Sequence, residues 1–292
     1  MKSLVFSLFL LSHSLNCSSQ ILSSTDSLRF WGDAMISLKT PDFRQAASSE
    51  FQKIAEKLIR ENSDSILLDF HPSIVKTSTH DGKLKFYSWA SELSENRIQY
   101  FSYLFFDHQK PVFLKSQERN LRRINYEELN AKNWYGALYY HILKDSFSAR
   151  YFLLGFATSP DGTKHRIIEP LYIDKDQILF GAPLFVKKDE NQKDEVYHRI
   201  LIHYSPSAQA VVNYNPELKQ IMYDHISSYT DAKSGETLLV PDGTFEAFDW
   251  NGSHWIHNPY LKNEILESAP IDKPLFNADT KSRDILGRKK SK

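Results

Sequence analysis

This sequence of 292 residues has almost no cysteine, since Cys17 is the only one. A single thiol cannot form a disulfide within the chain or a zinc site built from several cysteines. If the first residues are removed as argued below, the mature protein has no cysteine at all. An exported protein of this size without disulfides must depend on its hydrophobic core for stability.

The sequence also has no excess of charge of either sign. Lys and Arg together number 36, as do Asp and Glu, so the formal net charge is zero. Without a positive field there is no general attraction to nucleic acid, and we expect no nucleic-acid partner. The share of hydrophobic residues, 41%, is typical of a folded protein.

Long hydrophobic runs are missing, and the clearest short one lies at the N-terminus. A positively charged start precedes the apolar run 4–11, and small polar residues follow. This run is shorter than the roughly 20 residues that a membrane-spanning helix needs, but it suits a secretory signal peptide. We predict that residues 1–19 are removed and that the protein is exported, periplasmic or secreted, with no transmembrane segment. Lipidation of Cys17 is the alternative, which Asn16 disfavours because a small residue is expected there.

The motifs of common enzyme classes are absent as well. The sequence has no G-x-S-x-G, no H-E-x-x-H, no P-loop and no G-x-G-x-x-G. Eleven histidines are present, but the spacings of His198 to His203 and of His254 to His257 place the rings on opposite faces of a strand. We therefore predict no metal site and no cofactor.

What is present is a hydrophobic period that changes near residue 64. Residues 42–62 carry Ala47, Phe51 and Ile54 at spacings of four and three, which predicts an amphipathic helix. Beyond it the period falls to two, and Asp-Gly and Asn-Gly pairs separate the segments. The predicted strands are 65–70, 83–90, 97–106, 111–115, 134–143, 151–157, 166–173, 178–186, 197–204, 209–214, 219–226, 237–240, 245–250 and 254–257.

Short strands in succession, without alternating helices, indicate a mainly β fold. We predict an antiparallel meander, sandwich or barrel-like, preceded by an N-terminal amphipathic helix. The predicted parts are a signal peptide (1–19), the N-terminal helix plus a small β part (20–115), a connector (116–132), a larger antiparallel β part (133–267) and a disordered basic tail (268–292).

Aromatic residues make up 13% of the chain and gather in "NWYGALYYHILKD", residues 133–145. If 134–143 is a strand, Trp134 and Tyr140 share one face and Tyr139 lies on the other. Both faces are largely apolar, as in a strand that is covered on both sides, so we interpret the stretch as core. The polar tips of the tyrosines leave a ligand-binding face as the alternative, with Trp134, Tyr139 and Tyr140 as its candidate residues.

Two acidic positions stand out because their neighbours are apolar. Glu169 lies in "IIEPLYI", and Asp224 lies beside His225 in "IMYDHI". A carboxylate turned inward without a partner has a raised pKa, and such groups are frequent in active sites. Glu169, Asp224 and His225 are therefore our candidate catalytic residues, although Pro170 indicates an edge strand or bulge that would turn Glu169 outward.

A set of segments from the aromatic stretch onward carries a resemblance. The segments are "WYGALYY" (134–140), "IIEPLYID" (167–174), "FGAPLF" (180–185), "YSPSA" (204–208), "MYDHIS" (222–227) and "PDGTFEAFDW" (241–250). In this order they resemble a family of exported proteins from Bacteroidetes-type bacteria for which no function is established. The resemblance implies a protein of the Gram-negative cell envelope, and it supplies no activity, substrate or catalytic residue.

Three functions are compatible with these observations. We favour an exported envelope protein without catalytic activity, binding or structural in role, whose partner is an envelope glycan or protein. The alternative is a hydrolase that acts on glycan or peptide through paired carboxylates, drawn from Glu169, Asp224 and Asp249. An outer-membrane barrel is disfavoured by the mean hydropathy of −0.46, by strands that are apolar on both faces and by the lysine-rich C-terminus.

Overall fold

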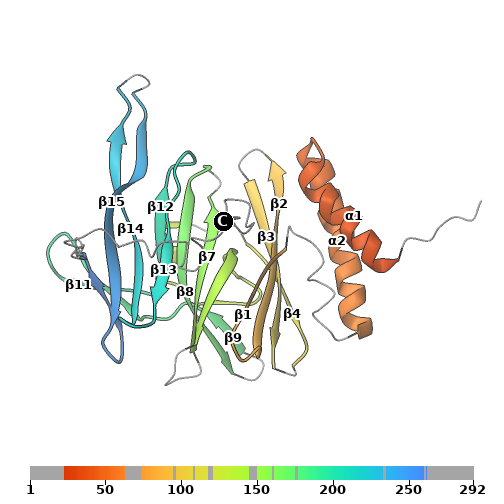
Figure 1. Cartoon of the computed structure of the whole chain (residues 1–292), viewed down its shortest axis with the longest axis horizontal. Coiled ribbons are helices and arrows are strands. Elements are labelled where there is room, and N and C mark those ends of the chain that lie inside the picture. Colours follow the sequence, from red (N-terminus) through yellow and green to blue (C-terminus); the bar gives the residue numbers. More distant parts are fainter. Residues whose placement is uncertain are drawn as a thin grey trace, which may run out of the picture.

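Three β-sheets, a pair of long helices and the short helix α3 (Leu121–Ile124) make up the described part of the chain. The computed structural model describes residues 23–62, 74–94, 97–107, 109–117, 121–144, 150–159, 161–174, 177–232, 235–259 and 261. The mainly β fold with antiparallel sheets is confirmed, and the sheets are open layers stacked face to face (Figure 1). Within these residues no helix is long and apolar enough to cross a membrane. The predicted signal peptide, the strand 65–70 and the tail from 268 lie outside them.

The first helix, α1 (Ser24–Ser37), was not predicted. Its start is nevertheless regular, because the Oγ of Ser23 accepts a hydrogen bond from the amide of Asp26 at 3.1 Å and so caps the helix. Its apolar pattern is blurred, since Phe30 and Ile36 are large apolar residues that remain mostly exposed. The buried stripe therefore does not stand out from the sequence.

The second helix, α2 (Pro41–Asn62), agrees with the helix predicted over 42–62. Its expected apolar stripe is buried, with Ala47 and Phe51 completely inaccessible to solvent. The two helices cover one face of the first sheet (Figure 1). There the ring of Phe51 meets that of Trp89 edge to face, with centroids 5.2 Å apart.

The first sheet is antiparallel and follows chain order. It contains β1 (Val75–Ser78), β2 (Leu84–Ser94), β3 (Arg97–Phe106) and β4 (Val112–Lys115). Side chains alternate between its two faces. Tyr87, Trp89 and Phe101 point to the helices, whereas Phe86 and Tyr100 point to the second sheet.

The second sheet is the central layer. It contains β5 (Leu129–Asn130), β9 (Gln177–Phe180), β8 (Lys164–Asp174), β7 (Arg150–Thr158) and β6 (Leu138–Lys144) in this order, and β12 (Ile200–Tyr204) also pairs with β8. One edge of β8 is paired with β7, while β12 and β9 share the other edge. The sheet packs on the first sheet with one face and on the third with the other, which explains its nearly continuous apolar strands.

The predicted strand 134–143 begins only at Leu138, because the chain turns at Gly136. The φ of Gly136 is +98°, and a Cβ there would lie 2.3 Å from the Cβ of Ser116. Trp134 therefore precedes the strand. The expectation that it shares a face with Tyr140 is wrong.

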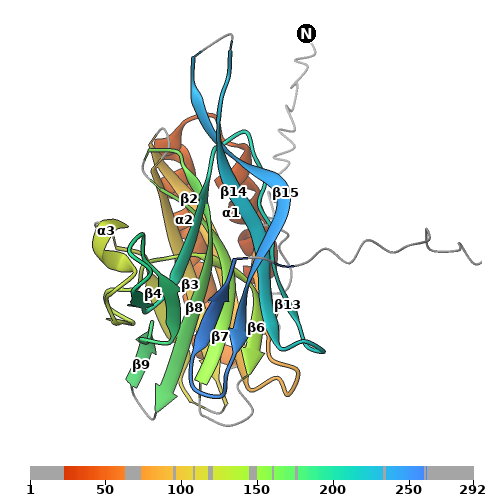
Figure 2. The ribbon, with the colours of Figure 1, turned by 90° about the vertical axis from the view of Figure 1, so that its left-hand side faces the viewer.

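The third sheet is the outer layer opposite the helices. Its order is β11 (Asp194–Tyr197), β10 (Phe185–Lys188), β16 (Trp255–Asn258), β15 (Thr237–Trp250), β14 (Gln220–Thr230) and β13 (Val212–Asn215). All these pairs are antiparallel except β10 with β16. β14 and β15 extend beyond their neighbours as a hairpin (Figure 1, Figure 2).

Two predicted boundaries in this region are wrong for identifiable reasons. The predicted strand 178–186 is two strands in different sheets, β9 and β10, because Gly181 turns the chain with a φ of +88°. The pair Asp242-Gly243, expected to form a turn, lies inside β15. There it forms part of a bulge, since the register with β14 shifts between Asp224 and Ile226.

Candidate functional site

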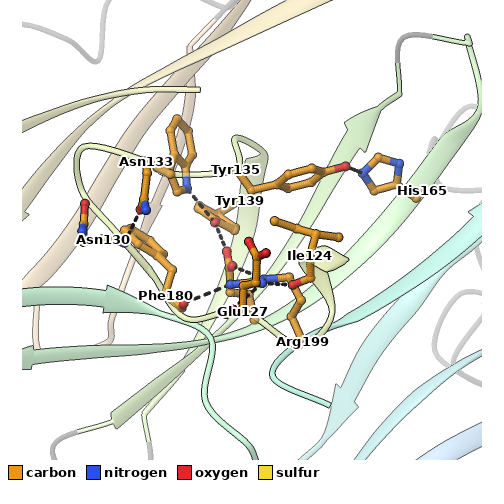
Figure 3. Close-up of polar contacts among 11 residues, drawn as sticks. Ile124, Glu127, Asn130, Asn133, Tyr135, Tyr139, His165, Phe180 and Arg199 are labelled. Atoms are coloured by element: carbon orange, nitrogen blue, oxygen red, sulfur yellow. Dashed lines mark hydrogen bonds and ion pairs between the residues drawn. The ribbon is translucent and has the colours of Figure 1, made fainter. Parts of the chain in front are cut away.

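The catalytic candidate Glu169 belongs to a buried network that consists of Trp134, Tyr139, Glu169 and Arg199 (Figure 3). The Nε of Arg199 donates to Oε1 of Glu169 at 2.6 Å, and both side chains are completely buried. The hydroxyl of Tyr139 donates to Oε2 of Glu169 and accepts from the indole Nε1 of Trp134 at 3.0 Å. The ligand candidates Trp134 and Tyr139 thus meet the catalytic candidate Glu169 in one place.

Arg199 attaches the predicted connector to the second sheet. Its Nη1 donates to the carbonyl oxygens of Ile124 and Glu127, and its Nη2 donates to that of Phe180 at 2.9 Å (Figure 3). Gly181 makes room for the guanidinium, because a Cβ there would lie 2.5 Å from Nη2. Every nitrogen of Arg199 therefore has a partner, which is what a buried cation requires.

The buried network has the properties of a structural element. The charge of Glu169 is balanced by Arg199, and the pKa of the Tyr139 hydroxyl is raised well above its usual value by burial and then by the carboxylate. Tyr139 therefore remains a neutral donor. All four side chains are completely buried, so no ligand reaches them in this conformation.

Glu169 points inward despite the proline that follows it. Pro170 lies in β8 between the part paired with β12, which ends at Ile168, and the part paired with β9, which begins at Leu171. The missing N–H of Pro170 is tolerated at this gap, and its carbonyl accepts from the amide of Gly181 at 2.7 Å. The expectation that the proline turns Glu169 outward is wrong.

His165 forms a second buried contact on the same side of β8. Its Nε2 lies 2.7 Å from the hydroxyl of Tyr135 (Figure 3), and its Nδ1 lies 3.4 Å from the Oγ of Ser159. Burial and, after it, the neighbouring His203 lower the pKa of His165 to about 3. The imidazole is therefore neutral at physiological pH.

The other two catalytic candidates lie in the third sheet, and the structure does not bring them to Glu169. Asp224 accepts a hydrogen bond from the amide of Val211 at 2.8 Å, on an exposed part of the surface. His225 of β14 lies opposite the bulge of β15, and its Nδ1 lies 2.7 Å from Oδ2 of Asp242. These contacts fasten neighbouring segments of the sheet to one another.

A polar cluster around Glu246 was not anticipated. Its carboxylate accepts from the hydroxyl of Tyr223 at 2.5 Å and lies 2.7 Å from Nε2 of His257 and 3.8 Å from Nζ of Lys187. Burial alone would raise the pKa of Glu246, but the hydrogen bonds from His257 and Tyr223 and the charge of Lys187 outweigh it and lower the pKa to about 2. Four different strands contribute these residues, so their proximity is invisible in the sequence.

A groove of about 410 Å³ lies on the second sheet. Small-molecule sites usually measure about 300–1,000 Å³. The lining residues come from β1, β6, β7, β8, β12 and the segment after β12, and they are Val75, Leu138, Tyr140, Phe156, Lys164, Arg166, Tyr204, Ala208 and Gln209.

Strand register explains why these side chains share one face. Leu138 is paired with Phe156, and Phe156 is paired with Arg166. On the next strand Tyr204 is paired with Lys164. Paired residues project from the same side of a sheet, so two neighbouring rows, one through Arg166 and one through Lys164, run across the floor of the groove.

Polar side chains of the floor hold the outer wall of the groove, which is the segment 206–212 that leads from β12 into the start of β13. Tyr140, Lys164 and Arg166 each donate a hydrogen bond to a backbone carbonyl of that segment. The distances are 3.0 Å from Tyr140 to Val212, 2.7 Å from Lys164 to Pro206 and 2.6 Å from Arg166 to Ala210.

The guanidinium of Arg166 lies over two aromatic rings. Its guanidinium carbon is 5.4 Å from the ring centroid of Tyr140 and 5.6 Å from that of Phe156, which is cation–π geometry. Burial raises the pKa of Tyr140 to about 12, although the charge of Arg166 opposes the rise, so the phenol is neutral. Of the three aromatic ligand candidates, only Tyr140 lines the groove, because Trp134 and Tyr139 are in the core.

Sequence reasoning missed the basic residues of the groove. The available signal was "KHRII", in which Lys164 and Arg166 are two apart and therefore share one face of a strand. The segment that completes the groove comes from beyond β12, and nothing local indicates where it lies.

Comparisons with protein-family models, with curated proteins and with solved structures found no match. Among the described residues, no group of three or more His, Cys, Asp or Glu is placed to hold a metal ion. A function must therefore be argued from the sites themselves.

Proposed function

We propose that the protein is an exported protein of the cell envelope that binds a ligand without transforming it, and that the groove is its binding site. The observation that carries the proposal is the groove itself, whose floor combines aromatic, apolar and cationic side chains on four neighbouring strands. A site on strands is held more rigidly than one on loops alone, which favours selective binding. Export is part of the proposal and rests on the N-terminal sequence.

A non-catalytic role is supported by the state of the candidate acids. Glu169 is neutralised by Arg199 in the core, and Asp224 is bonded to a backbone amide in another sheet. The nine residues that line the groove include no carboxylate, imidazole, thiol or serine hydroxyl. Hydrolysis by the carboxylate alternative needs two acids facing one bond, and the groove supplies none.

The proposal is tested by filling the groove. Ala208 lies in the outer wall, so Ala208→Trp places an indole in the site, and Ala232→Trp makes the same change on an exposed turn of the β14–β15 hairpin. Ligand-observed NMR with a library of small fragments is run on the wild type and on both variants. We expect fragments that bind the wild type and the hairpin variant but lose at least tenfold in affinity for Ala208→Trp. If the groove variant retains every fragment, the proposal is wrong.

A further inference from the structure

We infer that the groove recognises a small organic anion, in which a carboxylate or a phosphate is joined to an apolar or aromatic body. The inference rests on the proposed function and adds the chemical class of the ligand. Three features of the groove carry it: uncompensated charge, a fixed guanidinium and apolar surface beside both.

The charge of the groove is uncompensated. Lys164 and Arg166 are both partly buried, and none of the nine lining residues is acidic. Within the described residues neither cation forms an ion pair, and the bonds given above are to backbone carbonyls, which carry no net charge. Two positive charges in a concave site attract an anion and are neutralised by it.

A purely structural role does not require these charges. Holding the segment 206–212 needs hydrogen-bond donors, and Tyr140 does the same task as a neutral phenol. Partly burying a cation costs free energy that a neutral donor would avoid. The choice of Lys164 and Arg166 is therefore better explained by a negatively charged ligand.

Arg166 is held in place before any ligand arrives. The rings of Tyr140 and Phe156 lie on its guanidinium, and its Nε is fixed by the carbonyl of Ala210. That bond uses one of the five N–H donors of the side chain. The planar fork of an arginine matches the oxygens of a carboxylate or phosphate, and fixing it beforehand reduces the entropy lost on binding.

The rest of the groove suits a larger body than an inorganic anion. Val75, Leu138, Phe156 and Tyr204 supply apolar surface next to the cations. A water molecule takes roughly 30 Å³ in the liquid, so 410 Å³ holds far more than an anionic head. A ring or short chain attached to the head would cover these side chains and gain from the burial.

The experiment compares matched probes by calorimetry. The probes are benzoate, phenyl phosphate, inorganic phosphate and benzamide, which is a neutral analogue of benzoate. We expect at least one aromatic anion to bind at least tenfold more tightly than benzamide and inorganic phosphate, and to weaken as salt is added. Arg166→Gln, which keeps a donor but removes the charge, should lower the affinity for that anion at least tenfold. Arg123→Gln, the same change on an exposed residue, should have no effect.

The outcomes separate the two proposals. Equal binding of benzamide and benzoate, both lost in Ala208→Trp, would leave the groove a ligand site and overturn its preference for anions. Equal binding of inorganic phosphate and phenyl phosphate would identify an adventitious anion site only and remove the apolar body from the inference. If no probe binds the wild type, the inference is wrong. If bound probes are insensitive to Ala208→Trp, the groove itself is not the site.

Discussion

The two faces of β8 differ in how their charged side chains are partnered. Glu169 faces the first sheet, where Arg199 balances it and every polar neighbour is engaged. Lys164 and Arg166 face the groove, where their partners are neutral carbonyls. Both arrangements occur on one strand of eleven residues.

The charge of Glu169 stabilises the fold, whereas the charges of Lys164 and Arg166 remain available to bind a ligand of opposite sign. A buried charge is tolerated only with a complete set of partners, and such a set closes the site to ligands. A partly buried charge with neutral partners keeps most of its attraction for an ion of opposite sign. An unusual charged residue in an apolar stretch of sequence, such as Glu169, is therefore compatible with a structural role.

The largest expected effect on stability comes from the completely buried face of β8. Glu169→Gln leaves the guanidinium of Arg199 without its counter-charge, so we expect the free energy of unfolding to fall by about 3–5 kcal/mol in urea titrations. Arg166→Gln, a charge-to-amide change three residues earlier on the same strand, should cost less than about 1 kcal/mol. Equal losses for the two variants would contradict the distinction between the faces.

An effect of similar size is expected from the aromatic partner of the network. Trp134 is completely buried, and Trp134→Ala should cost about 3–5 kcal/mol through the lost packing and the cavity. Urea titration measures the loss, and Phe30→Ala, on a mostly exposed residue of α1, is the control that should change little. A small loss of stability for Trp134→Ala would mean that this residue is not a core residue and would favour the alternative that it binds a ligand.

The sequence predicted the fold better than the sites, for reasons that Trp134 illustrates. The alternation of apolar residues depends on neighbours along the chain, so most strands and the helix α2 were predicted. The face of Trp134 was not predicted, because it depends on the turn at Gly136 and on the close approach of Gly136 to Ser116, which precedes that glycine by 20 residues.

The buried network and the groove depend on contacts between residues that are still farther apart in the chain. Glu169 was noticed for its apolar neighbours, but its partner Arg199 is 30 residues away and carries no local signal. Tyr140 was noticed for its ring, whereas Arg166 beside it was not. Their proximity requires the register of β6, β7 and β8, which a single sequence does not contain.

A smaller effect is expected from the pH dependence of stability that the buried face of β8 contributes. Because the pKa of His165 is about 3 in the folded protein and 6.5 when unperturbed, the unfolded chain binds the additional proton between these values. Stability is therefore complete above about pH 6.5 and falls as the pH decreases toward 3, with a loss from this group of roughly 3 kcal/mol at about pH 4.5. Glu246, with a pKa lowered from 4.5 to about 2, adds to the loss only below about pH 4.5.

Urea titrations at about pH 7.5 and about pH 4.5 measure this dependence. His165→Gln should be destabilised at neutral pH, because it disturbs the contact with Tyr135, but its stability should change less between the two pH values. His80→Gln, on an exposed residue, should keep the wild-type difference. A wild-type difference in His165→Gln would show that another group titrates.

The smallest effect is expected at Asp224, which belongs to neither face of β8. Its carboxylate accepts one hydrogen bond from the amide of Val211 on an exposed surface. Asp224→Asn keeps an oxygen in that position and removes only the charge, so we expect the stability to change by less than about 0.5 kcal/mol.

The same variant tests the hydrolase alternative, because a catalytic carboxylate does not tolerate the loss of its charge. If the wild type hydrolyses a glycan or peptide and Asp224→Asn loses that activity at unchanged stability, Asp224 would be catalytic, and the third sheet would contain the reaction centre.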